Sequence, residues 1–163
     1  MTDPLLAEIT EAVTIGRAGD SARARALLLP LWERLNPTDA FHRCVLAHYL
    51  ADLYAHPAEA LVWDVRALDA AAGVTDDDFR QLVPGGVAAS FYPSLHLNVA
   101  DQLRQLGAFE AAAAHLDAAH RHTWALGDDP YGATIRSELQ AVAHAVESRD
   151  GASRAPDSPK SGR

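Results

Sequence analysis

Residues 97–119, with the sequence LNVADQLRQLGAFEAAAAHLDAA, decide the fold of this chain. Two runs of strong helix formers flank the dipeptide Leu106-Gly107. Glycine readily adopts the left-handed backbone that ends a helix, so Gly107 predicts a tight turn between two helices. Small side chains, which let two helices approach closely, recur on both sides of this turn at Ala100, Ala112 and Ala119. The stretch therefore predicts a helical hairpin.

The remainder of the chain carries the same helical signals. Alanine accounts for 33 of the 163 residues and leucine for 20, and no segment alternates persistently between apolar and polar residues, so we expect an all-α fold. Helix starts such as Asp3-Pro4 and stops such as Gly19 bound the apolar stripes. The expected helices span residues 4–18, 22–35, 39–54, 57–72, 93–106, 109–125 and 130–148, with one short helix at 77–82.

The hairpin pattern recurs twice upstream, with turns near Gly19 and Tyr54. These two turns and the one at Gly107 are separated by 35 and 53 residues. The Leu-Gly turn, the aromatic Phe109 after it and the small contact residues resemble the tetratricopeptide repeat, a helix–turn–helix family with units of about 34 residues. The resemblance implies a right-handed array of three hairpins in one domain at 1–148, capped by the last helix.

In that family the first helix of each hairpin lines a concave groove that binds a peptide segment or helix of a partner protein. The resemblance therefore implies a groove formed by the expected helices at 4–18, 39–54 and 93–106. Apolar anchors would be buried there, and polar residues would fix the register of the bound segment. Carried over position by position, the groove residues are Ile9, Val13, Arg17, Cys44, His48, Asp52, Leu97, Asn98, Asp101, Arg104 and Gln105.

The second interval exceeds one repeat by about 19 residues, which indicates an insertion at 74–93. Phe79, Phe91 and Tyr92 make this segment too apolar for a simple linker. Long irregular loops are usually functional or disordered. Two alternatives are open: the segment closes one end of the groove and contributes to binding, or it fills the space between hairpins.

Charge and cysteine content exclude several classes of function. The chain has 22 acidic and 14 basic residues, for a net charge of −8. A nucleic-acid binder or a protein adsorbed to an anionic membrane needs a basic surface, so we expect neither partner. No signal peptide or membrane span is evident, and the single Cys44 cannot form an internal disulfide, which favours a reducing cytoplasm. Residues 149–163, rich in polar residues, Pro, Ser and Gly, predict a disordered tail.

The sequence contains no recognisable catalytic motif. It lacks a phosphate-binding glycine loop, a Gly-x-Ser-x-Gly nucleophile elbow and an HExxH zinc motif. Cys44, His48 and Asp52 share one helix stripe at four-residue spacing, but a cysteine in the middle of an apolar helix is typical of a core. No two of the 8 histidines have the four-residue spacing of a chelating helix face. We therefore expect no enzyme activity, no cofactor and no metal.

These observations predict a non-enzymatic protein-interaction module that acts as an adaptor or scaffold, with a protein or peptide as its partner. The alternative is a regulatory or sensor domain that binds a small molecule under the 74–93 segment. Self-association as a homodimer is a further possibility, because the ends of a helical array can pair.

Overall fold

The computed structural model describes residues 3–154, and every regular element within that range is a helix. The all-α class expected from the sequence is therefore confirmed. In chain order the elements are α1 (Pro4–Arg17), α2 (Ser21–Arg34), α3 (Ala40–Ala51), α4 (Pro57–Ala71), α5 (Asp76–Phe79), the 3-10 turn η1 (Ala88–Ser90), α6 (Phe91–Gln105), α7 (Phe109–His120), the 3-10 turn η2 (Thr123–Ala125) and α8 (Pro130–Glu147). Most of the expected boundaries lie within three residues of these.

Aspartate side chains start four of the long helices. The carboxylates of Asp3, Asp20, Asp39 and Asp129 accept backbone N–H groups of the first turn at 2.7–3.3 Å. Each carboxylate satisfies donors that have no partner within the helix. The cap at Asp3 was predicted from the sequence, and caps of this kind account for the accuracy of the helix starts.

One helix ends earlier than expected. The expected helix at 109–125 stops at His120, and η2 follows as a separate turn. The backbone N–H of His122 donates to the carbonyl of Ala119, while the His122 ring nitrogen Nδ1 contacts the carbonyl of Ala118 at 3.0 Å. The histidine ring thus competes with the backbone for the carbonyl that would continue the helix.

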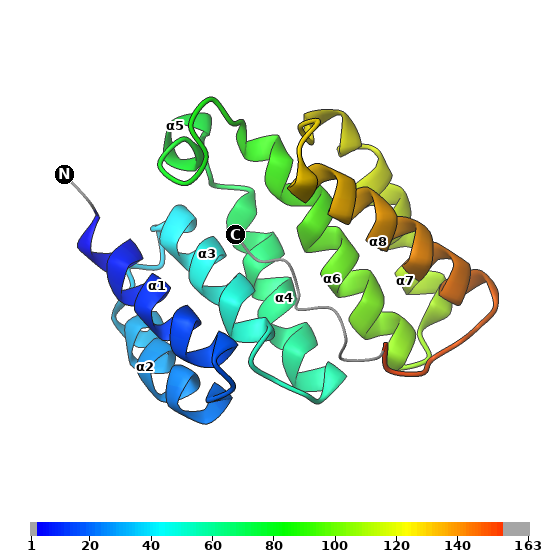
Figure 1. The fold of residues 1–163 in the computed structure, drawn as a ribbon, viewed down its shortest axis with the longest axis horizontal. Coiled ribbons are helices and arrows are strands. Elements are labelled where there is room, and N and C mark those ends of the chain that lie inside the picture. Colours follow the sequence, from blue (N-terminus) through cyan, green and yellow to red (C-terminus); the bar gives the residue numbers. More distant parts are fainter. Residues whose placement is uncertain (1–2, 155–163) are drawn as a thin grey trace.

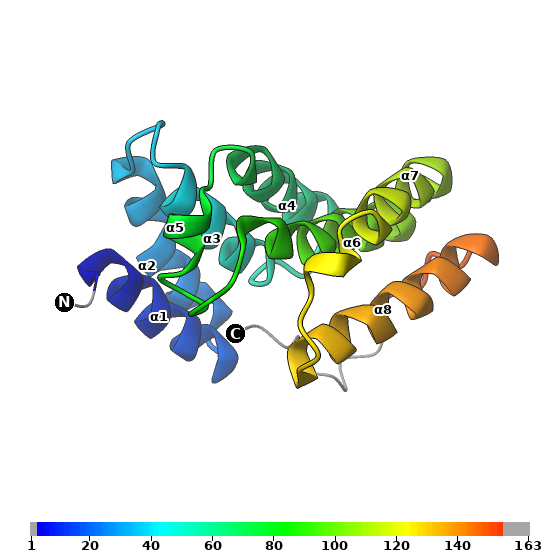
Figure 2. The ribbon, with the colours of Figure 1, turned by 90° about the horizontal axis from the view of Figure 1, so that it is seen from above.

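Consecutive helices pack in pairs. α1 packs on α2, α3 on α4 and α6 on α7, while α4 also packs on α6, and α8 on both α6 and α7. The pairs follow one another along the molecule, from α1 and α2 at one end to α6, α7 and α8 at the other (Figure 1). In the second view, α1 and α8 both lie below the level of α4 and α7 (Figure 2).

Two hydrophobic cores meet at α6. Leu95, 1% exposed, belongs to the first core, and Leu97, 2% exposed, belongs to the second. The first core is built by α1 to α4 and contains Phe41 and Trp63, and the second is built by α6, α7 and α8 from aliphatic side chains and alanines. Since neighbouring residues of α6 face opposite cores, this helix joins the two halves of the molecule.

The segment expected as an insertion packs against the first core. Phe79 is 6% exposed, and its ring meets Phe91 edge-to-face with centroids 4.6 Å apart. The Asp76 carboxylate accepts the backbone N–H of Ala88 at 2.7 Å, which closes the loop between α5 and η1. Phe91 and Tyr92 belong to α6 and contact the first core. Of the two alternatives, these contacts favour a filler between helix pairs.

Candidate functional site

Three of the expected groove residues lie in the cores. Ile9 is 1% exposed, Cys44 is 0% exposed and Leu97 is 2% exposed. The interpretation of these side chains as groove residues is wrong, because they face neighbouring helices. In α3, seven of the twelve residues are buried, and Cys44, the first member of the stripe with His48 and Asp52, is one of them. Burial raises the pKa of the Cys44 thiol to about 12, so the thiol is not a poised nucleophile. Val13 is half-buried and packs against the first core.

The remaining α1 and α3 candidates lie nearer the surface. Arg17 is exposed, while His48 and Asp52 are half-buried. The His48 ring lies 5.8 Å from the ring of Tyr49, at a tilted angle. The stripe of Cys44, His48 and Asp52 thus runs outward from the core, and Asp52 at its end lies near other polar side chains.

A cluster of polar side chains, which we call the tyrosine cluster, draws its members from α1, α3, α6 and α8. Burial raises the pKa of the Tyr49 phenol. The charge of Arg17 lowers this pKa, whereas Asp52 and Tyr131 raise it, so groups from α1, α3 and α8 influence one another. Burial also raises the pKa of Tyr131, whose hydroxyl forms a hydrogen bond with the Ser94 side chain of α6. The members of the tyrosine cluster are Arg17, Tyr49, Asp52, Ser94 and Tyr131. Sequence reasoning missed Tyr49, Ser94 and Tyr131, because nothing local indicates that residues of α3, α6 and α8 influence one another.

Polar side chains continue along α6 beyond Ser94. The amide Nδ2 of Asn98 contacts a carboxylate oxygen of the buried Asp64 on α4 at 3.4 Å. Gln105 is half-buried, and its amide donates to the backbone carbonyl and the carboxylate of Asp101 at 3.4 and 3.3 Å. Asn98, Asp101 and Gln105 therefore form a row of hydrogen-bonding groups on α6.

Arg104 was expected to line the groove, but it is 1% exposed and therefore lies in the interior. Its Nε and Nη2 atoms lie 2.9 and 2.8 Å from one carboxylate oxygen of Asp101, which balances the buried charge. Its Nη1 donates to the backbone carbonyls of Asp150 and Ala152 at 2.6 and 2.8 Å. Arg104 therefore binds a non-helical segment that follows α8. Of the tail expected at 149–163, residues 149–154 are described, and 155–163 lie outside the described residues.

Tyr92, expected in the 74–93 insertion, lies in α6 and stacks with histidines at the α6–α7 contact. Its ring lies 4.8 Å from His122, and the Nδ1 atoms of His96 and His115 are 2.9 Å apart. Burial, reinforced by His115, His122 and Arg121, lowers the pKa of His96 to about 4, and burial also lowers the pKa of His115. Spacing within single helices could not indicate this cluster, because its members come from different elements. Within residues 3–154, no three His, Cys, Asp or Glu side chains are arranged to hold a metal ion.

No family model, curated protein or solved structure matches this chain. In the range 3–154, none of the helices combines the length and the apolar character that crossing a membrane requires. The case for a function therefore depends on the geometry of the chain itself.

Proposed function

We propose that this chain is a cytoplasmic, non-enzymatic interaction module of tetratricopeptide-like hairpins, which binds an extended peptide segment of a partner protein along α6. The pairing of α1 with α2, α3 with α4 and α6 with α7 supports the repeat assignment, as do the turn glycines Gly19 and Gly107, with φ of 103° and 80°. α8 would then be the capping helix.

One observation carries the proposal: Arg104 already holds two backbone carbonyls, of Asp150 and Ala152, with a single guanidinium nitrogen. The two carbonyls are two residues apart, as are the carbonyls that point to the same side of an extended chain. A side chain that binds backbone carbonyls accepts a segment of any sequence, and a partner segment would displace residues 150–152 to reach the buried Arg104. Side chains elsewhere on the face would then supply specificity.

The tyrosine cluster is suited to that second role. Ser94 and Arg104 are ten residues apart on α6, which corresponds to about 15 Å along the helix and to about five residues of extended peptide. Arg17 and Asp52 present opposite charges, and the phenols of Tyr49 and Tyr131 combine an apolar ring with a hydrogen-bonding group. A peptide with one charged and one apolar side chain at this spacing would match both ends.

Display of a random peptide library, with the intact chain as bait, tests the proposal. Enriched peptides should bind saturably in solution, and the Arg17→Glu/Asp52→Lys variant should weaken them at least about tenfold, because both charges are reversed. The matched control, Arg23→Glu/Glu33→Lys, reverses one charge of each sign at exposed positions of α2. Failure to enrich any peptide would overturn the proposal, as would equal weakening by the site variant and the control. Sedimentation in the same buffers would separate peptide binding from pairing of two copies of the chain.

A further inference from the structure

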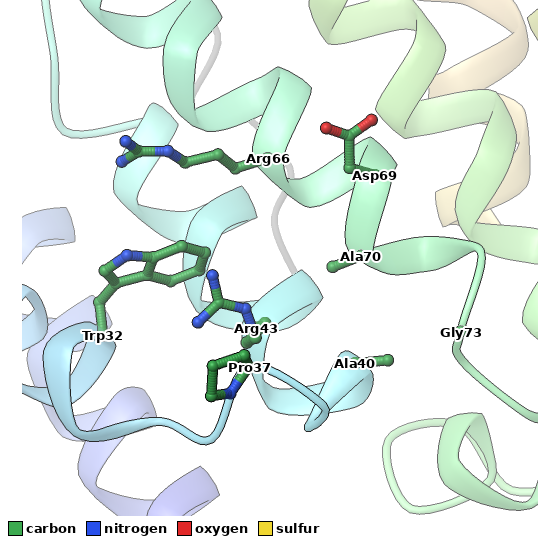
Figure 3. Close-up of a pocket in the computed structure, with 8 residues that line it drawn as sticks. All are labelled: Trp32, Pro37, Ala40, Arg43, Arg66, Asp69, Ala70 and Gly73. Atoms are coloured by element: carbon green, nitrogen blue, oxygen red, sulfur yellow. The ribbon is translucent and has the colours of Figure 1, made fainter.

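A second site lies outside the tyrosine cluster, in a hollow between α2, α3 and α4 with a volume of about 350 Å³. Its polar lining consists of Arg43, Arg66 and Asp69, and Trp32 forms one wall (Figure 3). Both arginine side chains extend toward the Trp32 indole, whereas Asp69 lies on the other side of the hollow in this view (Figure 3). The lining also includes Ala40, Ala70 and Gly73, whose small size leaves room in the hollow.

Aromatic stacking holds both guanidinium groups in place. The Arg43 Cζ lies 3.9 Å from the centroid of the Trp32 ring, and the Arg66 Cζ lies 4.4 Å from that of Trp63 and 5.7 Å from that of Trp32. The two indoles meet edge-to-face at 5.1 Å, so the platform is itself fixed. A guanidinium over an aromatic face gains cation–π energy and keeps its in-plane N–H donors available.

These two arginines differ from most others in the described range. Arg80 and Arg149 pair with carboxylates at the surface, and Arg104 pairs with Asp101 in the interior. Neither the Arg43 nor the Arg66 guanidinium donates a hydrogen bond to, or forms an ion pair with, any residue in 3–154. In a chain with 22 acidic against 14 basic residues, carboxylate partners are abundant, yet the hollow contains only one, Asp69.

We propose that this hollow binds a small oxyanion ligand, a phosphate ester or a carboxylate, that also carries a hydroxyl or amino group. Both guanidinium groups lie beside the Trp32 ring, with Cζ 3.9 and 5.7 Å from its centroid, so an anionic ligand that lies along this ring can contact both. Guanidinium matches a phosphate or a carboxylate with paired N–H donors. Asp69 would accept a hydrogen bond from the hydroxyl or amino group. The volume is at the lower end of the range for small-molecule sites, which favours a ligand of metabolite size.

Tryptophan fluorescence tests the proposal, because two of the three tryptophans form the platform. The intact chain is titrated at constant ionic strength with pyrophosphate and, separately, with succinate. A saturable change should appear with at least one probe, and the probe that binds distinguishes a phosphate ester from a carboxylate. Arg43→Gln and Arg66→Gln should each weaken binding at least about tenfold. Asp69→Asn should strengthen binding of these probes a few-fold by removing repulsion, because neither probe carries the alcohol or amino group that Asp69 would bind.

Two controls keep the result decisive. Arg23→Gln removes an exposed charge of α2 outside the hollow and should leave the affinity within about twofold. Far-UV circular dichroism checks each variant, and Arg66, which is exposed, decides the outcome if Arg43→Gln does not fold. The proposal is overturned if neither probe gives a saturable change up to about 10 mM, if Arg66→Gln binds like the original chain, or if Arg23→Gln loses as much affinity.

Discussion

The first core, around α1 to α4, and the second core, around α6 to α8, are filled by different side chains and use arginine differently. Around the first core, the Arg43 guanidinium stacks on the Trp32 ring and the Arg66 guanidinium on the Trp63 ring. Both guanidinium groups lie close to the surface, and neither has a carboxylate partner in residues 3–154. In the second half, Arg104 is buried with its carboxylate and holds backbone from beyond α8. A large aromatic surface lets a cation remain near water, whereas a core of alanines and aliphatic side chains accepts one only when it is paired with an opposite charge. The first arrangement leaves guanidinium donors without a protein partner in the described residues, whereas in the second the donors hold backbone that the chain itself supplies.

The strongest test of this comparison asks whether the two cores unfold together. Leu95→Ala and Leu97→Ala each remove a buried side chain from one core, and each should cost about 3 kcal/mol of unfolding free energy. Because α6 contributes to both cores, the circular-dichroism and tryptophan-fluorescence transitions in urea should coincide for both variants. Leu106→Ala, at a 43% exposed position, is the control and should cost little. If Leu97→Ala splits the two transitions, the halves are independent units.

The next largest effect should distinguish the buried arginine from a surface one. Arg104→Met leaves Asp101 without its partner and the Asp150 and Ala152 carbonyls without a donor, so we expect a loss of about 2–3 kcal/mol in urea unfolding. Arg80→Met breaks an exposed pair with Asp77 and should cost less than about 0.5 kcal/mol. Equal losses in the two variants would remove the distinction.

How much of this arrangement could be predicted from the sequence depends on whether the signal was local. The cap at Asp3 and the turns at Gly19 and Gly107 are local, and they were predicted correctly. Cys44 and Leu97 were misplaced because a family position states which helix a residue belongs to, whereas burial depends on every neighbouring helix. α3 and α6 are covered on several sides, and none of their positions is fully exposed.

The contacts that define the candidate sites join residues far apart in sequence. The Arg104 side chain meets carbonyls 46 and 48 residues away, and the Arg66 guanidinium meets a ring of α2. Charge, spacing and periodicity within one helix carry no information about such partners. The sequence therefore predicts helices and turns well, but it could indicate neither the arginine hollow nor the histidine cluster.

The turn glycines provide a smaller test, which compares the two halves position by position. Gly19 and Gly107 both have positive φ, 103° and 80°, with open space where a Cβ would lie. Gly19→Ala and Gly107→Ala should therefore each cost about 1–2 kcal/mol from backbone strain alone. Asparagine tolerates this backbone better, so Gly19→Asn and Gly107→Asn should recover part of the loss in thermal unfolding. A steric clash as the cause would instead make the larger asparagine worse than alanine.

The smallest expected effect is a difference between the two halves in how their stability depends on pH. The pKa of His96 lies near 4 in the folded chain, below its ordinary value of 6.5, chiefly because burial disfavours the charged ring. Between these two values the unfolded chain binds more protons, so stability is lost as the pH falls from 6.5 toward 4. In the first half, the pKa of the Asp3 carboxyl is lowered below 3.8; burial raises it, but bonds to His42 and to backbone N–H groups outweigh burial. Its contribution is therefore lost only at more acid pH.

Urea unfolding at pH 7 and pH 5 measures this difference. Because the His96 ring is half-buried and partly solvated, we expect a loss of about 1 kcal/mol, less than the full shift would give. His96→Gln should reduce the loss by at least half, because glutamine does not titrate, whereas His144→Gln, at an exposed position of α8, should leave it unchanged. An unchanged pH dependence in His96→Gln would show that the acid sensitivity comes from other groups. The His96–His115 contact would then be a hydrogen bond between α6 and α7 whose protonation does not govern stability in this range.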